Sequence, residues 1–175
     1  MRIYKDMITG DEMFTDSSKI NLIDDCLYEV VCQHVVRKEG EILLDGANPS
    51  AEEGGDEGTD EHVESGLDLV LNQRLVETAF NKADYMNYLK TYTKTLADKW
   101  KEEGFTEEQM ADAKAKITEA VKKIRPKLSD CSFYMGESAN PDGMVALLDY
   151  RENADGKGET AYMLFFKHGV IEEKV

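Results

Sequence analysis

The chain has 175 residues, of which 41% are hydrophobic, and this is enough for one domain with a core of its own. Its formal net charge of −15 at pH 7 disfavours nucleic acid as a partner, because nucleic-acid phosphates repel an acidic surface. The charge is uneven, since residues 45–68 hold nine acidic residues and no Lys or Arg, while residues 81–127 hold eleven basic and eight acidic residues. We therefore expect an acidic protein with one mildly basic segment.

The start of the chain and its cysteines indicate where the protein works. The first residues include no apolar stretch typical of a signal peptide, and no apolar run approaches the roughly 20 residues of a membrane span. Cys26, Cys32 and Cys131 are odd in number and form no Cys-x-x-Cys pair. We therefore expect a cytoplasmic protein with reduced thiols and no membrane span.

The first part of the chain is predicted to form short strands. Ile20–Ile23 and Cys26–Val36 are predicted as two strands that turn at Asp24 and Asp25, with alternate residues of the second strand on one face. Further strands are predicted at Ile3–Lys5, Ile42–Leu44 and Leu67–Leu71, and a polar loop followed by Met13 and Phe14 comes after the first of them. Residues 45–65, rich in Gly, Asp and Glu, are predicted to be a mobile acidic loop.

Residues 81–127 are predicted to form two antiparallel helices joined by a short turn. Asn81 suits the cap of the first helix, Gly104 suits the left-handed position that ends it, and Thr106–Gln109 is a capping box for the second helix. Apolar residues at steps of three and four predict one buried face on each helix. These residues are Tyr85, Leu89, Tyr92, Leu96 and Trp100 in the first helix, and Met110, Ala113, Ile117, Val121 and Ile124 in the second.

The last part of the chain is again predicted to be strands, at Phe133–Gly136, Met144–Arg151, Tyr162–Lys167 and Val170–Glu173. Neither strand-rich part is large enough to be stable alone, because each has only a few short strands. We therefore predict a single domain of the α+β class, mainly β. Its core is formed by residues 1–44, 66–80 and 128–175, and the helical hairpin of residues 81–127 is inserted into the β-structure and projects from it.

No pattern of catalytic or metal-binding residues is present in the sequence. His34, His62 and His168 form no His-Glu-x-x-His motif. The segment 153–158 imitates the start of an EF-hand loop, but Leu164 stands at the twelfth position, where a bidentate Glu belongs. We expect a protein that is not an enzyme and has no tightly bound cofactor. The acidic loop has two alternative interpretations. It either binds Ca²⁺ weakly, with no particular residues assigned as ligands, or is simply solvated.

The helical hairpin carries exposed lysines that suit an acidic partner. Lys90, Lys94, Lys122 and Lys123 are candidate contacts to an acidic polymer such as a microtubule. A solubilising surface without a partner is the alternative.

Two segments of the sequence resemble a known family. Asp45–Glu53 opens the acidic loop and Phe133–Arg151 begins the last third of the chain. Both resemble the signature segments of the translationally controlled tumour protein family, also called histamine-releasing factor, and Asp11–Phe14 resembles a part of that family's start. The resemblance implies a β-tent core of mixed sheets with a projecting helical hairpin, and no settled enzymatic activity.

The resemblance also implies partners. Members of the family are associated with calcium, with tubulin and microtubules, with the small GTPase Rheb, with anti-apoptotic proteins, and with histamine release outside the cell without a signal peptide. They commonly end in Lys-Cys, whereas this chain ends in Lys174 and Val175. A disulfide dimer through that cysteine is therefore not expected, and we expect a monomer.

Within the matched segments, the resemblance puts Glu12 at the position used for GTPase contact. Asn48, Ser50 and Glu137 match polar positions of the two signatures and are candidate surface contacts. Their local alternatives are a turn at residues 48–50 and a hydrogen bond from Glu137 to the loop before Pro141.

Three functions are compatible with these features. The first in rank is a calcium-responsive, microtubule-associated regulator of growth and survival. The second is a regulator of nucleotide exchange on a small GTPase, and the third is an enzyme whose site the sequence does not reveal.

Overall fold

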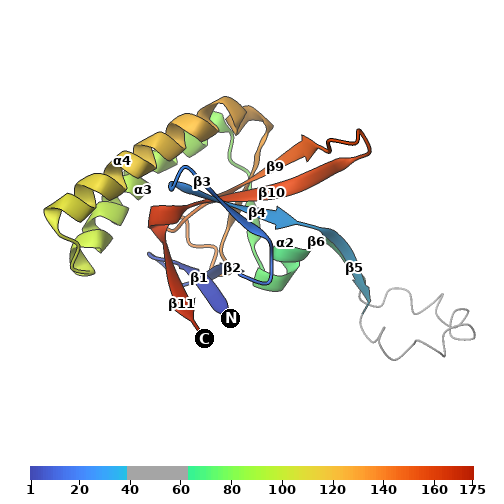
Figure 1. The fold of residues 1–175 in the computed structure, drawn as a ribbon, viewed down its shortest axis with the longest axis horizontal. Coiled ribbons are helices and arrows are strands. Elements are labelled where there is room, and N and C mark those ends of the chain that lie inside the picture. Colours follow the sequence, from blue (N-terminus) through green and yellow to red (C-terminus); the bar gives the residue numbers. More distant parts are fainter. Residues whose placement is uncertain (39–62) are drawn as a thin grey trace, which may run out of the picture.

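The computed structural model describes residues 1–38 and 63–175. In these ranges the chain forms three antiparallel sheets and a pair of long helices (Figure 1). The strands are β1 (Arg2–Asp6), β2 (Glu12–Thr15), β3 (Ile20–Ile23), β4 (Leu27–Cys32), β5 (His34–Lys38), β6 (Val63–Leu67), β7 (Val76–Thr78), β8 (Ser132–Met135), β9 (Ala146–Glu152), β10 (Glu159–Phe166) and β11 (Val170–Lys174). The helices are α2 (Asp68–Gln73), α3 (Lys82–Glu102) and α4 (Glu107–Ile124), with short 3-10 helices η1 (Arg125–Asp130) and η2 (Lys167–Gly169).

The two ends of the chain share the same sheets. In the sheet of order β11-β1-β2, the last strand pairs with the first in a register that runs from Arg2 opposite Lys174 to Asp6 opposite Val170. In the larger sheet, of order β3-β4-β10-β9-β8-β7, strand β10 lies beside β4. The prediction that both strand-rich parts contribute to one β-structure is therefore confirmed, and the fold is α+β and mainly β.

Aromatic side chains join the two larger sheets. The ring centroid of Phe14 in β2 lies 4.4 Å from that of Tyr4 in β1 and 4.5 Å from that of Phe165 in β10. All three side chains are buried. Burial of one large apolar side chain is worth about 1.5–3 kcal/mol, so this cluster helps to hold the smaller sheet against the larger one.

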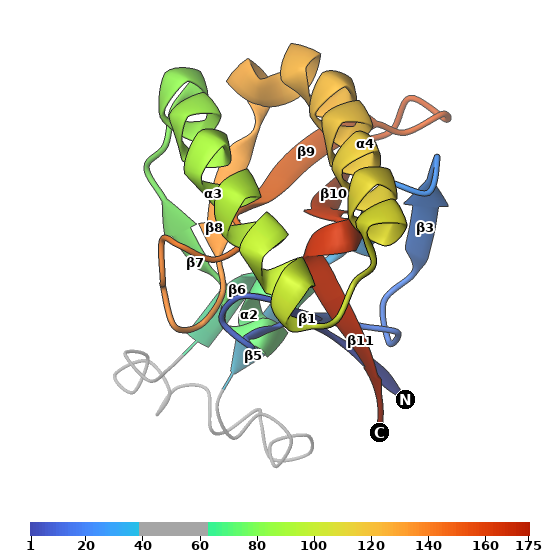
Figure 2. The same ribbon diagram turned by 90° about the vertical axis from the view of Figure 1, so that its left-hand side faces the viewer.

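The predicted helical hairpin is confirmed, together with its caps. Asn81 and Asp84 form a capping box at the start of α3, and Thr106 and Gln109 form another at the start of α4. Gly104, in the turn between the helices, has a left-handed φ of +85°. Figures 1 and 2 show the two helices side by side along one side of the β-structure.

The hairpin is docked on the β-structure through the face that the sequence predicts. In α3 the buried residues are Tyr85, Leu89, Tyr92, Leu96 and Trp100, and in α4 they are Ala113, Ile117, Ala120 and Ile124. The indole nitrogen of Trp100 donates a hydrogen bond of 3.0 Å to the carbonyl oxygen of His168. The contact with the β-structure therefore extends to the last turns of α3.

The predicted strand Cys26–Val36 is interrupted at Gln33. Strand β4 ends at Cys32, and β5 belongs to a separate two-stranded sheet with β6. The amide of Gln33 donates to the carboxylate of Asp68 at 3.0 Å, and the amide of Asp68 donates to the carbonyl of Gln33 at 2.8 Å. These two bonds take Gln33 out of the β4 ladder, and Val36 is 61% exposed instead of sharing a buried face.

The predicted strand Leu67–Leu71 is wrong beyond Leu67. Helix α2 begins at Asp68, whose carboxylate accepts a hydrogen bond of 2.7 Å from the amide of Leu69. A carboxylate in the first turn stabilises a helix start, and the alternation of leucines alone does not reveal it.

Two further differences concern the neighbouring segments. The acidic loop was predicted to reach residue 65, but β6 begins at Val63. Strand β7, which pairs with β8, was not predicted. The predicted strand Ile42–Leu44 and most of the acidic loop lie outside the described residues.

Among the helices of the described ranges, none combines the length and apolar character needed to cross a membrane.

Candidate partner-binding site

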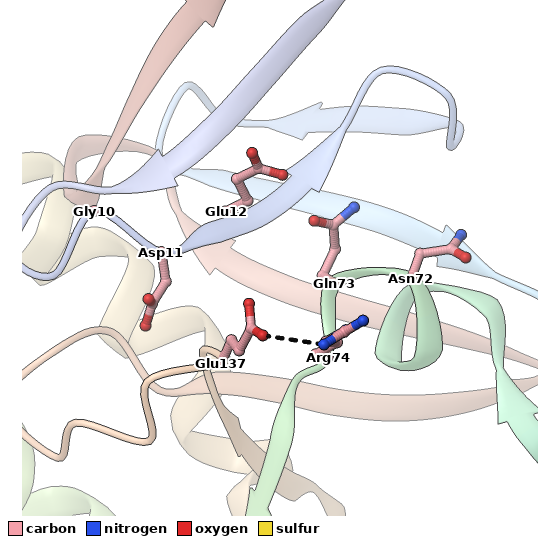
Figure 3. A pocket seen from close by; sticks show the side chains of 7 residues that line it. All are labelled: Gly10, Asp11, Glu12, Asn72, Gln73, Arg74 and Glu137. Carbon is pink, nitrogen blue, oxygen red and sulfur yellow. Dashed lines mark ion pairs between the residues drawn. The ribbon is translucent and has the colours of Figure 1, made fainter.

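An open pocket of about 320 Å³ lies where the β1–β2 turn, the end of α2 and the loop after β8 meet (Figure 3). It is lined by Gly10, Asp11, Glu12, Asn72, Gln73, Arg74 and Glu137. Glu12 and Glu137, two of the candidate partner contacts, therefore line the same pocket although they come from opposite parts of the chain. Most of the lining is polar, and carboxylates outnumber the one guanidinium group.

The β1–β2 turn positions Glu12. Gly10 has a left-handed φ of +82°, which favours glycine. The amide of Gly10 donates to the carbonyl of Asp6, and the amide of Asp6 donates to the carbonyl of Asp11, both at 2.8 Å. These bonds close the turn, so that Glu12 begins β2 opposite Lys5 at the rim of the pocket.

A buried carboxylate fixes this turn to the segment before β9. Asp6 is only 2% exposed. Its oxygens accept hydrogen bonds from the amide of Met144 at 2.7 Å, the amide of Ile8 at 2.9 Å and the hydroxyl of Thr9 at 3.0 Å. Burial raises the pKa of Asp6, and the bonds from Met144, Ile8 and Thr9 offset only part of that increase.

A second aspartate fixes the loop that carries Glu137. The Oδ2 atom of Asp11 accepts hydrogen bonds from the hydroxyl of Ser138 at 2.6 Å and from its amide at 3.3 Å. A Cβ atom at Gly136 would lie 2.5 Å from the same Oδ2, so only glycine fits between Asp11 and the loop. Glu137 stands between these two anchored residues, which hold it at the pocket.

Arg74 faces Glu137 across the pocket. It ends α2 in a left-handed conformation with a φ of +56°. Its guanidinium lies 3.6 Å from the carboxylate of Glu137, drawn as the dashed line in Figure 3. Both side chains are exposed, and exposed ion pairs contribute little to stability. The pair therefore leaves Glu137 available to a cation from a partner.

The segment that contains Glu137 is also tied to the helical hairpin. The hydroxyl of Tyr88 in α3 donates to the carbonyl of Gly143 at 2.5 Å and accepts from the amide of Val145 at 3.0 Å. Burial raises the pKa of Tyr88 well above its ordinary value, so the hydroxyl keeps the proton that it donates. The hairpin and the two aspartates thus hold the same segment from two sides.

The four candidate lysines of the hairpin have different surroundings. Lys90 and Lys94 line a groove of about 530 Å³ between α3 and α4, together with Lys114. Leu96, Trp100 and Ile117 also line it. Lys122 is exposed on α4, and Lys123 forms an ion pair with Asp24. The other two candidates, Asn48 and Ser50, lie outside the described residues.

Burial favours the uncharged forms of the three cysteines and of His168. Burial raises the pKa of Cys32 to about 12 and that of Cys131 to about 11, and it also raises the pKa of Cys26, so all three thiols stay protonated at neutral pH. Burial lowers the pKa of His168. In the part of the chain that is described, no three His, Cys, Asp or Glu side chains are grouped closely enough to hold a metal ion.

Sequence reasoning missed three residues that shape the pocket. Asp6 and Asp11 flank a turn that contains Gly10, and a glycine at this place is a sign of a tight turn. The neighbouring sequence does not indicate that the two aspartates form hydrogen bonds with Met144 and Ser138. Arg74 follows a segment predicted as a strand, so the helix end that positions it was not expected.

Comparison with known proteins identifies the family. A model of the translationally controlled tumour protein family matches residues 1–171. The chain belongs to this family. A translationally-controlled tumor protein homolog from Grammostola rosea is 70% identical over the full length of both chains, and one from Ixodes scapularis is 64% identical over 99% of both chains.

Solved structures of translationally controlled tumour proteins have the same fold. The Schizosaccharomyces pombe protein p23fyp is 40% identical and superposes with a TM-score of 0.75 over 100% of both chains. The Caenorhabditis elegans protein is 39% identical, with a TM-score of 0.67 over 100% of this chain and 99% of that one. The family and the fold class predicted from the signature segments are therefore confirmed.

Proposed function

We propose that this protein is a non-enzymatic binding and regulatory protein whose pocket around Glu12 and Glu137 contacts a small GTPase. The observation that carries the proposal is that these two residues line one acidic pocket, held there by Asp6 and Asp11. Such a pocket suits a basic side chain of a protein partner better than a phosphate group. We propose that it acts in the cytoplasm and, after release from the cell, also outside it.

The chemistry of the contact is electrostatic. Glu12 is exposed at the rim, so its carboxylate is free to reach into a partner's nucleotide site. A carboxylate there competes with phosphate for Mg²⁺ or for the P-loop lysine, and the nucleotide is then held less tightly. In this role the protein favours nucleotide exchange without breaking or forming a covalent bond.

The test is release of a fluorescent nucleotide from purified Rheb, the GTPase associated with the family. Wild-type protein should accelerate release, while Glu12→Gln and Glu12→Val should not. Glu159→Gln, an exposed glutamate at the start of β10, serves as the control and should behave as wild type. Equal release rates with and without the wild-type protein would remove the proposal.

A second function, association with microtubules through the hairpin, is favoured by the grouping of Lys90, Lys94 and Lys114 at one groove. Microtubules carry an acidic surface, and clustered lysines attract such a surface at low salt. This groove shares no lining residue with the acidic pocket, so the two functions can be tested separately.

Weak Ca²⁺ binding is proposed for the acidic segment of residues 45–68, most of which lies outside the described residues; its carboxylates would repel one another less with a divalent cation among them. An NMR titration of the labelled protein with Ca²⁺ tests it. Shifts confined to the amides of this segment are expected, and shifts centred on any other part of the chain would contradict it.

A further inference from the structure

The turn between β3 and β4 lies against helix α4. Figures 1 and 2 both show β3 beside the hairpin. The turn carries two adjacent carboxylates, Asp24 and Asp25, and three lysines surround them. Lys116 and Lys123 come from α4, and Lys167 comes from η2.

Each carboxylate of the turn has a lysine partner. Asp24 forms an ion pair with Lys123. Asp25 accepts a hydrogen bond of 2.5 Å from Lys167 and lies 4.0 Å from Lys116. The hydrogen bond from Lys167 lowers the pKa of Asp25, and the bond to Asp24 raises the pKa of Lys123, so both contacts favour the charged forms. The lysines therefore already bind a pair of neighbouring carboxylates.

The backbone of the turn is compatible with aspartates, and their side chains add contacts with the lysines. Asp24 and Asp25 have φ angles of +47° and +58°, and the amide of Cys26 donates to the carbonyl of Ile23 at 2.9 Å. Positive φ at both central positions is typical of a type I′ turn, in which Gly, Asn and Asp predominate and Asn-Gly and Asp-Gly are preferred pairs. Asp25 stands at the position where glycine is most favoured, and its carboxylate contacts Lys167 and Lys116, which glycine could not do.

We propose that Lys116, Lys123 and Lys167 form a binding surface for adjacent carboxylates of an acidic peptide, and that the turn of Asp24 and Asp25 occupies it as an internal competitor. The internal contact shows which chemistry the surface accepts: two carboxylates on neighbouring residues. An outside segment must displace the turn, so a run of acidic residues is favoured over a single one.

The lysines become available to an outside acidic peptide only if that peptide can displace the turn of Asp24 and Asp25. The turn belongs to the same chain, which gives it a high effective concentration at the lysines. However, the lysines and aspartates are partly exposed, and exposed ion pairs are individually weak. A multivalent acidic segment can therefore replace the turn without unfolding the sheet.

This surface shares no residue with the acidic pocket, but Lys123 is also one of the candidate microtubule contacts predicted from the sequence. To that extent the inference rests on the proposed microtubule association, which the turn of Asp24 and Asp25 would limit by occupying Lys123. The test uses a fluorescent oligoglutamate peptide instead of microtubules, so that either proposal can fail without the other.

The main variant is Asp24→Asn/Asp25→Gly, which removes both carboxylates and installs the residues that a type I′ turn prefers. The control is Glu152→Gln/Glu159→Gln, which removes two carboxylates from paired residues, one at the end of β9 and the other at the start of β10. Both variants change the net charge equally, so only a local effect of the turn distinguishes them. Thermal unfolding confirms that each variant is folded.

The turn variant should bind the oligoglutamate peptide about tenfold more tightly than wild type at low salt, and the control less than about twofold. Adding Lys116→Gln, Lys123→Gln and Lys167→Gln to the turn variant should abolish the gain. Asp25→Asn alone keeps the bond between Asp24 and Lys123 and should show a smaller gain. An unchanged affinity in the turn variant, or an equal gain in the control, would mean that the turn is only a structural tether, and the proposal would be overturned.

Discussion

Asp11 and Ser138 are joined by a hydrogen bond of 2.6 Å that links the turn beside Glu12 to the loop that carries Glu137. This bond connects the first and last thirds of the chain at the rim of the acidic pocket. Because Gly136 packs directly on the same carboxylate, the loop has little freedom to move relative to the turn. The geometry of the pocket therefore depends on a residue that need not touch any partner.

Replacing Asp11 should disturb the pocket without removing Glu12 or Glu137. Asp11→Ala loses both bonds to Ser138 and should lower the free energy of unfolding by about 1–2 kcal/mol, since the site is only partly buried. Acceleration of nucleotide release should fall as well. Urea unfolding and the nucleotide-release assay measure the two effects.

A double-mutant cycle supplies the control for this prediction. Ser138→Ala removes the stronger of the two bonds from the other side. If Asp11 and Ser138 act through that bond, the double variant should lose clearly less unfolding free energy than the two single variants lose together. Additive losses would show that Asp11 acts through something other than Ser138.

Tyr88 should matter more for stability than the two tyrosines next to it on the same helix. Tyr88→Phe leaves the carbonyl of Gly143 and the amide of Val145 without their partner and should cost about 2–3 kcal/mol. The hydroxyls of Tyr85 and Tyr92 are buried and have no hydrogen-bond partner in the described chain. Tyr85→Phe and Tyr92→Phe should therefore be neutral or stabilising in the same denaturation experiment. A loss at Tyr92 as large as that at Tyr88 would contradict the assignment.

The buried carboxylate of Asp6 should give stability a distinct pH dependence. Its pKa is raised in the folded protein above the ordinary value of 3.8, so between these two values the folded state binds more protons than the unfolded state. The contribution of Asp6 to stability is then fully present below 3.8 and falls as the pH rises through the raised pKa. The difference in unfolding free energy between wild type and Asp6→Asn should shrink over that interval. A difference that grows with pH would contradict the raised pKa.

The sequence predicts the hairpin well because its signals are local. Asn81, Thr106 and Gly104 act on residues within one turn of themselves, and the apolar stripe of α3 repeats at regular steps. The sequence does not predict the interruption of the strand at Gln33 or the helix that begins at Asp68, and the interruption depends on a contact between residues distant in sequence. Gln33 leaves its strand because Asp68 binds it, and Asp68 starts a helix where leucines alternate.

The candidate site was predicted only in part, for a similar reason. Glu12 and Glu137 were found through short segments that resemble the family, which mark positions but not distances. Their meeting in one pocket depends on Asp6 and Asp11, whose hydrogen bonds reach residues more than a hundred positions away. Arg74 could not be found because its role follows from the end of a helix that the sequence pattern does not show.

The hairpin lysines should contribute unequally to microtubule association. Lys90 and Lys94 line the groove, whereas Lys123 is already engaged by Asp24. Lys90→Gln/Lys94→Gln should therefore reduce co-sedimentation with microtubules by more than twice the effect of Lys123→Gln, because a paired lysine has less attraction left for an outside anion. Raising the salt concentration should weaken wild-type binding and reduce the difference between the variants. Lys82→Gln, at the opposite end of α3 from the turn, controls for net charge. A loss in the double variant no more than twice that of either single variant would show that the overall charge of the hairpin decides binding and that the groove has no particular role.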